Sequence, residues 1–118
     1  MMIKVMVLIR RRPDLSREQF RAYYENHHVP LIDRLLPFYR LYRRHYLGEG
    51  LRPGQIDGDF DVITELGFAS AADFDAWRAA LAEPHILEQI RADEAHFLVS
   101  DATRLWIVTE CASNYTIS

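Results

Sequence analysis

The sequence predicts an α+β fold in which one antiparallel sheet is backed by helices. Short apolar runs rich in β-branched residues occur at four places, and two segments with helical periodicity and N-terminal capping residues lie between them. The elements therefore follow the order β-α-β-β-α-β. At 118 residues the chain is long enough to bury its own core, so we expect residues 1–118 to form a single domain.

Composition and charge exclude several classes of protein. The net charge of -3 provides no electrostatic reason to bind nucleic acid or an anionic membrane. No apolar run approaches the length of a membrane span, and the first residues follow a strand pattern rather than that of a signal peptide. A single cysteine, Cys111, excludes an intrachain disulfide and a CxxC metal site. We therefore expect a cytoplasmic protein.

The first strand is predicted over residues 2–10, where the chain is almost continuously apolar. A helix is predicted from about residue 17 to 28. Ser16 and Gln19 have the spacing of a capping box at its start, and Pro30 is expected to end it by disfavouring the α conformation at the preceding residue.

The apolar face of this helix carries aromatic and titratable groups. At a period of 3.6 residues, one face collects Phe20, Tyr23, Tyr24, His27 and Leu31, with His28 at its edge. Imidazole changes its protonation state near neutral pH, and phenol groups donate and accept hydrogen bonds. The end of this helix is therefore the first candidate for a chemical site.

A second strand is predicted over residues 40–48, a loop over 48–58 and a third strand over 61–68. Alternation places Tyr42, Arg44 and Tyr46 on one face of the second strand and His45 on the other. If the Tyr42 face meets a cavity, it forms an aromatic, cationic wall suited to a phenolate or carboxylate. If the other face does, His45 becomes a second acid or base.

The remaining elements are two helices and a strand. Ser70 is an N-cap signature, and Phe74, Trp77 and Leu81 give the helix that follows an apolar face. Pro84 begins a further short helix that runs to about residue 95, and the last strand is predicted over 103–110. The complete order is the ferredoxin-like arrangement with a four-stranded antiparallel sheet.

The sheet face opposite the helices is expected to be apolar as well. Met6 and Leu8 of the first strand and Trp106 and Val108 of the last share that face. Exposed apolar patches of this size usually mark an interface, so we predict an isologous homodimer that packs sheet on sheet. The alternative is that a loop or the C-terminal tail covers this face within one chain.

Three segments of the chain resemble the EthD-domain family of the dimeric α+β barrel superfamily. They are Leu15–Phe20 leading to Tyr23-Tyr24 and His28-Val29-Pro30-Leu31, then Glu65–Phe68, and then Asp93–Phe97. The resemblance implies a dimeric α+β barrel, and it makes His28 the recurrent histidine of the family's His-x-Pro-Leu motif. The founding member belongs to an ether-degradation gene cluster. Similar barrels act as polyketide cyclases, dehydratases, decarboxylases, lactone isomerases, cofactor-free oxygenases and haem-handling enzymes.

His28 has two interpretations. It is either a general acid or base at the mouth of a cavity, or a helix C-terminal histidine that caps the last carbonyl groups. Tyr23 and Tyr24 are either core aromatics or groups that hold a substrate oxygen. With His45 these are the candidate catalytic residues.

The candidate substrate-binding residues are Phe20, His27, Tyr42, Arg44 and Glu65. His27 and His28 point about 100° apart on a helix, so we expect no metal site there. Glu65 interrupts an apolar strand, which indicates either an ion pair, with Arg44 as the favoured partner, or a carboxyl group with a raised pKa.

The sequence contains no nucleotide, phosphate-loop, nucleophile-elbow or metalloprotease motif. The leading hypothesis is a small cofactor-free enzyme of secondary metabolism or aromatic degradation. It would bind an apolar, aromatic oxo or phenolic substrate and catalyse cyclisation, dehydration or isomerisation by proton transfer. The alternatives are a monooxygenase or haem-handling barrel, and a non-enzymatic dimer that binds a small molecule or supports a partner oxidase.

Overall fold

The computed structural model describes residues 2–56 and 58–116. Its elements in chain order are β1 (Ile3–Ile9), α1 (Arg17–Tyr23), the π-helical turn η1 (Tyr24–His28), α2 (Val29–Leu35), β2 (Leu41–Tyr46), β3 (Val62–Phe68), α3 (Ala71–Ala82), α4 (Pro84–Glu94), the 3₁₀ turn η2 (Ser100–Ala102) and β4 (Arg104–Val108). The strands form one sheet in the order β2-β3-β1-β4, with every neighbouring pair antiparallel. The predicted α+β class and ferredoxin-like order are confirmed.

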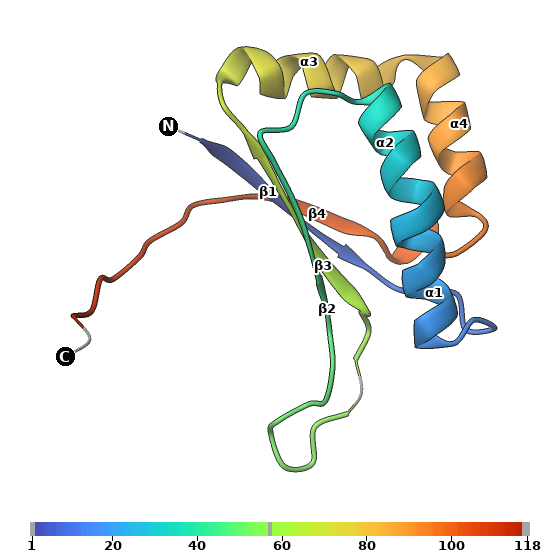
Figure 1. The fold of residues 1–118 in the computed structure, drawn as a ribbon, viewed down its shortest axis with the longest axis vertical. Coiled ribbons are helices and arrows are strands. Elements are labelled where there is room, and N and C mark those ends of the chain that lie inside the picture. The colour runs from blue at the N-terminus through green and yellow to red at the C-terminus, as the bar shows by residue number, and fades with distance from the viewer. Residues whose placement is uncertain (1, 57, 117–118) are drawn as a thin grey trace.

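The helices lie together on one side of the sheet (Figure 1). The core fills the space between them and consists of the inward residues of the strands and the helices: Val5, Val7, Ile9, Phe20, Tyr24, Ile32, Leu36, Val62, Leu66, Phe68, Trp77, Ile90, Phe97 and Leu98. The β2–β3 connection and the segment after β4 extend away from this body (Figure 1). Within the described residues, no helix combines the length and the apolar character needed to cross a membrane.

Strand register decides which side chains share a face. Val5 lies opposite Leu66 on β3 and Ile107 on β4, and these side chains face the helices. Met6 lies between Glu65 and Trp106 on the face that the helices leave open. Trp106 is accordingly 52% exposed. The predicted apolar groups of this second face therefore do lie together.

The first helical segment is longer than predicted. The Ser16–Gln19 capping box is present, but the chain stays helical through Pro30 to Leu35. Proline has no N–H group, so the helix cannot close its usual bond at this position. The chain responds with a wide turn in which the Val29 N–H donates to the Tyr24 carbonyl, five residues back. The expectation that Pro30 ends the helix is wrong.

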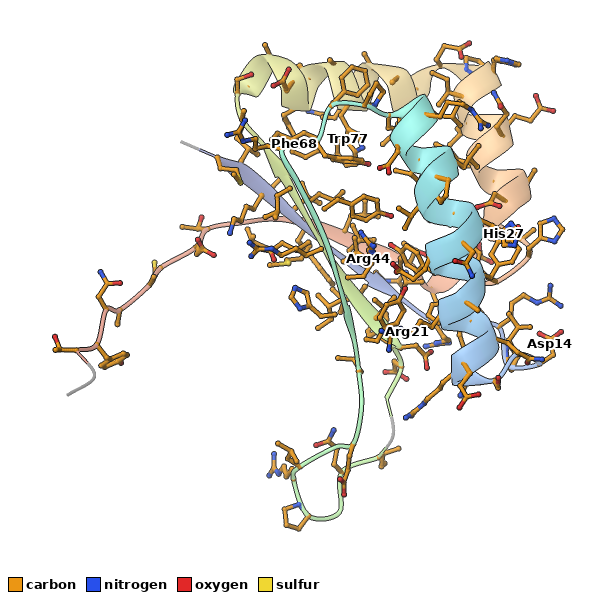
Figure 2. All side chains as sticks on the ribbon, viewed as in Figure 1. Asp14, Arg21, His27, Arg44, Phe68 and Trp77 are labelled. Carbon is orange, nitrogen blue, oxygen red and sulfur yellow. The ribbon has the colours of Figure 1, made fainter. Side chains whose placement is uncertain are left out.

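The wide turn changes which residues face the sheet. Side chains four apart drift by about 40° per step on a regular α-helix, but one extra residue in a turn removes most of the accumulated drift. The inward face consequently follows a spacing of four residues: Phe20, Tyr24, His28, Ile32 and Leu36 are all buried. His27 is exposed on the outer side of the helix (Figure 2), so its predicted inward position is wrong.

The other two helices begin where their caps predict. The Ser70 hydroxyl accepts a hydrogen bond from the Asp73 N–H at the start of α3, and the Glu83 carboxylate accepts from two N–H groups at the start of α4, with Pro84 in its first position. Trp77 is buried beneath α3 and packs against Phe68 (Figure 2). This packing fixes the end of the sheet farthest from η1.

Candidate functional site

A cavity of about 540 Å3 lies between the helices and the sheet. Its walls are mostly aliphatic and aromatic, with a few polar side chains converging on it, as in small-molecule sites. The lining residues come from every layer of the fold: Val7, Ile9, Tyr24, His28, Ile32, Leu36, Tyr39, Tyr42, Thr64, Leu66, Trp77, Leu81, Leu87, Ile90, Arg91, Glu94, Ser100, Asp101, Thr103 and Leu105. The cavity is large enough for a ligand of two or three fused rings.

His28 is held in the cavity wall by Asp93. The Nδ1 atom of His28 lies 2.7 Å from Oδ2 of Asp93, and the Tyr23 hydroxyl donates to Oδ1 of the same carboxylate at 2.7 Å. The two partners come from η1 and the last turn of α4. With both oxygens engaged, Asp93 fixes the orientation of the imidazole ring, as a carboxylate does for an acid–base histidine.

The environment of His28 favours its neutral form. Burial lowers the pKa of His28, and the hydrogen bond that its ring donates to Asp93 partly opposes that shift. Among the residues that the structure describes, every fully buried side-chain nitrogen or oxygen has a hydrogen-bond partner. The Nε2 atom of His28 has none there, so this nitrogen is not fully buried, and His28 lines the cavity. A neutral imidazole with Nδ1 bound to a carboxylate presents Nε2 as a base.

A chain of hydroxyl groups lies beside His28. Tyr42 donates to the Tyr24 hydroxyl at 3.1 Å, and the Tyr24 hydroxyl lies 2.7 Å from that of Thr64. Burial raises the pKa of Tyr24 and of Tyr42, so both remain protonated at neutral pH. These groups are hydrogen-bond donors and acceptors for a ligand oxygen rather than bases.

A second hydroxyl is presented by Tyr39. The indole N–H of Trp77 donates to the Tyr39 hydroxyl at 2.9 Å, which occupies an acceptor position on that oxygen. Burial raises the pKa of Tyr39, so its proton remains in place and available to donate. Both side chains line the cavity. This pair therefore forms another polar anchor in an otherwise apolar wall.

The two faces of β2 divide the predicted site. Tyr42 lines the cavity, whereas Arg44 and Tyr46 on the same face bind Glu25 and line a neighbouring charged hollow. The Arg44 guanidinium also donates to Glu25 through Nε at 3.0 Å, and this pairing lowers the pKa of Glu25. Of the predicted aromatic and cationic wall, only Tyr42 lines the cavity, while Arg44 is engaged in an ion pair with Glu25 beside it.

Glu65 and His45 lie on the open face of the sheet. The Glu65 carboxylate accepts from Lys4 at 3.1 Å and lies 3.4 Å from the His45 ring, and these contacts lower its pKa. The ion pair predicted for Glu65 is present, but the prediction of Arg44 as its partner is wrong, because Arg44 pairs with Glu25. Arg44 lies opposite Thr64 in the ladder and so projects to the helix side, whereas Arg43 lies opposite Glu65.

The remaining predicted residues lie in two places. Tyr23, Tyr24 and His28 gather at the cavity or its edge, while the Phe20 ring packs against Tyr24 and Phe97 within the core. His27 does not line the cavity. Among the described residues, no group of three or more histidine, cysteine or acidic side chains has the arrangement of a metal site.

Sequence reasoning missed several residues of the cavity. Tyr39 and Glu94, which line the cavity, and Asp93, which binds His28 in the cavity wall, had no assigned role, although Asp93 and Glu94 belong to the third segment that resembles the EthD family. Asp93 reaches His28 from a position 65 residues further along the chain. Only their place in that segment marks Asp93 and Glu94 in the sequence.

The fold and the cavity define a class: an α+β domain with a four-stranded antiparallel sheet and a ligand-sized space beneath its helices. The family follows from the sequence match. The EthD domain matches residues 12–101, which is most of the chain. The protein belongs to the EthD family.

Solved structures of low sequence identity share this fold. An EthD family protein of Bacillus halodurans C-125 is 21% identical, with a TM-score of 0.64 over 94% of this chain and 100% of that chain. SnoaB of Streptomyces nogalater, a cofactor-independent oxygenase, is 15% identical, with a TM-score of 0.57 over 95% of each chain. A dimeric, ferredoxin-like protein of unknown function from Bacteroides fragilis is 14% identical, with a TM-score of 0.52 over 91% of this chain and 94% of that one. A comparison with curated protein sequences finds no match.

Proposed function

We propose that the protein is a small cofactor-independent enzyme that moves a proton on an apolar aromatic ligand carrying a ketone or phenol oxygen. The ligand occupies the cavity between the helices and the sheet. His28 takes the proton through Nε2, and the Tyr24 hydroxyl, which accepts from Tyr42, donates a hydrogen bond to the ligand oxygen. Cyclisation, dehydration and isomerisation next to a carbonyl all begin with such a step.

The observation that carries this proposal is the contact between His28 and Asp93 at the cavity wall. The 2.7 Å contact to the carboxylate orients the ring, and burial keeps the imidazole neutral, as a base at neutral pH must be. His28 also lines the space of about 540 Å3, and its Nε2 atom has no protein partner among the described residues. The surrounding apolar wall excludes water from the reacting atoms.

The test is proton exchange from aromatic ketones in deuterium oxide. A panel of aromatic polyketides, phenols, lactones and aryl carboxylates is first screened for compounds that raise the melting temperature of the protein, and the ketones and phenols among them are selected. Deuterium incorporation into these compounds is then followed by mass spectrometry. We expect His28→Gln to lower the exchange rate by roughly two to four orders of magnitude.

The adjacent histidine provides a matched control. His27→Gln removes an exposed imidazole from the same helical turn and is expected to leave the rate unchanged. Equal rates in wild type and His28→Gln would remove the proton-transfer role. Ligand binding without exchange in either protein would favour the non-enzymatic binding function.

A second candidate function is cofactor-independent oxygenation. SnoaB, whose fold this chain shares, is a cofactor-independent oxygenase. Removal of a proton from a phenol or an activated carbon yields an electron-rich anion, and the same cavity histidine would supply that step. Oxygen consumption in the exchange assay, measured with a Clark electrode, separates oxygenation from simple isomerisation.

The open face of the sheet supports a homodimer. Trp106 is 52% exposed beside Met6 on that face, and the Bacteroides fragilis protein of the same fold is dimeric. Two copies that pack these faces together would bury the apolar side chains in a symmetric interface. Sedimentation at micromolar concentration is expected to give a dimer for wild type and a monomer for Trp106→Arg, and a wild-type monomer would contradict the dimer.

A further inference from the structure

The Glu94 carboxyl group is a polar feature of the cavity to which the proposed proton transfer assigns no role. Glu94 is the last residue of α4, and its side chain lines the cavity with Leu87 and Ile90 of the same helix. Among the described residues, its side chain has no hydrogen bond or ion pair, and no fully buried polar atom there lacks a partner. The carboxyl oxygens are therefore not fully buried, and the side chain that carries them forms part of the cavity wall.

The surroundings of Glu94 disfavour a negative charge. The C-terminal end of a helix carries a partial negative charge, and the Asp93 carboxylate adds to it. The guanidinium of Arg91 has the opposite effect but forms no ion pair with Glu94 within the described part of the chain. Burial outweighs it and raises the pKa of Glu94 to about 7.

Besides Arg91, which lines the cavity without an ion pair to Glu94 among the described residues, the ionisable groups of the lining are His28 from η1, Asp101 from η2, and the tyrosines Tyr24, Tyr39 and Tyr42. Burial keeps the histidine neutral, and the tyrosines remain protonated. None of these groups forms a contact with Glu94 that would neutralise it as a carboxylate. The protonated acid is thus the form that suits this environment.

We propose that Glu94, as a carboxylic acid, donates a hydrogen bond to a neutral carbonyl oxygen of the aromatic ligand in the cavity. This inference rests on the proposed function, and it narrows the ligand class to neutral aromatic ketones. A protonated carboxyl group is a strong donor, and it becomes acceptor-only once ionised. An aryl carboxylate would meet a repelling charge whenever Glu94 is ionised, so the site discriminates against anions as pH rises.

The probe for the experiment is prodan, a neutral naphthyl ketone whose emission moves to longer wavelength when its carbonyl accepts a hydrogen bond. Binding and emission are measured from pH 5 to 9 for wild type, Glu94→Gln and Glu94→Ala. Glu88→Gln is the matched control, because Glu88 lies on the same helix and is exposed. Circular dichroism checks that each variant is folded.

In the wild type we expect the emission of bound prodan to shift to shorter wavelength as pH rises through about 7. The affinity should fall about two- to tenfold over the same range, the usual worth of one hydrogen bond. Glu94→Gln keeps a donor at every pH, so its emission should stay at long wavelength. Glu94→Ala should emit at short wavelength throughout, and Glu88→Gln should behave as wild type.

Two results would overturn the inference and are distinguishable. If prodan binds but its emission is independent of pH in wild type, or if the shift persists in Glu94→Gln, the titrating group is not Glu94. The proposed function would then stand without this donor. If prodan does not bind wild type at all, the aromatic-ligand cavity itself is refuted, and the inference fails with it.

Discussion

Replacing Glu94 with glutamine is expected to stabilise the folded protein above neutral pH while changing it little at pH 5. The amide has the shape of the protonated acid and cannot ionise. Burial raises the pKa of Glu94 from 4.5 to about 7 in the folded protein, so folding favours the protonated form. The stability that this group contributes is complete below pH 4.5, and it is lost as pH rises to about 7.

The size of the effect follows from the shift. Each unit of pKa corresponds to about 1.4 kcal/mol. A rise from 4.5 to about 7 therefore limits the difference in unfolding free energy between Glu94→Gln and wild type to about 3.4 kcal/mol. Solvent reaches part of the carboxyl group, which reduces the expected difference to about 2 to 3 kcal/mol at pH 8. At pH 5 the same reasoning leaves less than about 1 kcal/mol between the two proteins.

The assay is urea unfolding at pH 5, 6.5 and 8, at one fixed protein concentration. Glu88→Gln on the exposed side of α4 removes the same charge from the same helix and controls for net charge. The free energy of unfolding of Glu94→Gln should exceed that of wild type increasingly with pH. Parallel curves for wild type and Glu94→Gln would refute the reasoning, because they would mean that Glu94 ionises equally easily in both states.

Three further substitutions test the contacts around the cavity. Tyr24→Phe leaves the buried Thr64 hydroxyl without its 2.7 Å partner and should cost about 1 to 3 kcal/mol of unfolding free energy in urea, part of which a second change, Thr64→Val, restores. Glu25→Gln breaks the pair with Arg44 and should cost about 1 to 2 kcal/mol at pH 7; because Arg44 lowers the pKa of Glu25, this difference should disappear as pH falls well below 4.5. Asp93→Asn should lower the pKa of the cavity histidine further, since the carboxylate raises it, and the NMR titration of the ring protons measures that change. An unchanged or higher histidine pKa would contradict this electrostatic role.

Local signals predicted most of the fold. Ser16, Ser70 and Pro84 mark helix starts, and in each case the structure begins the helix at the next residue or at the proline itself. Alternation in the first strand correctly assigns Val5 and Val7 to the buried face. These features depend on neighbouring residues only, so a single sequence is sufficient to read them.

The site was harder to predict from the sequence, because it depends on contacts between residues that are far apart along the chain. The Glu65 carboxylate pairs with Lys4 of β1 and lies opposite Arg43 of β2, and sequence spacing alone does not specify these strand registers. Asp93 reaches His28 only because α4 packs beside η1. The inward position of His28 itself depends on the wide turn at Pro30, whereas counting at 3.6 residues per turn selects His27.

The extra residue in η1 also matters for how this chain is compared with others. The helix before the turn and the helix after it follow two different registers. In a relative whose helix is regular, the residues that match Phe20 and Ile32 can both face the sheet only if one residue fewer lies between them. An ungapped alignment pairs the cavity residue of such a relative with His27, whereas a one-residue gap at η1 pairs it with His28. Removing one residue from this turn would thus exchange the side chain at the cavity and leave the residues of the sheet unchanged.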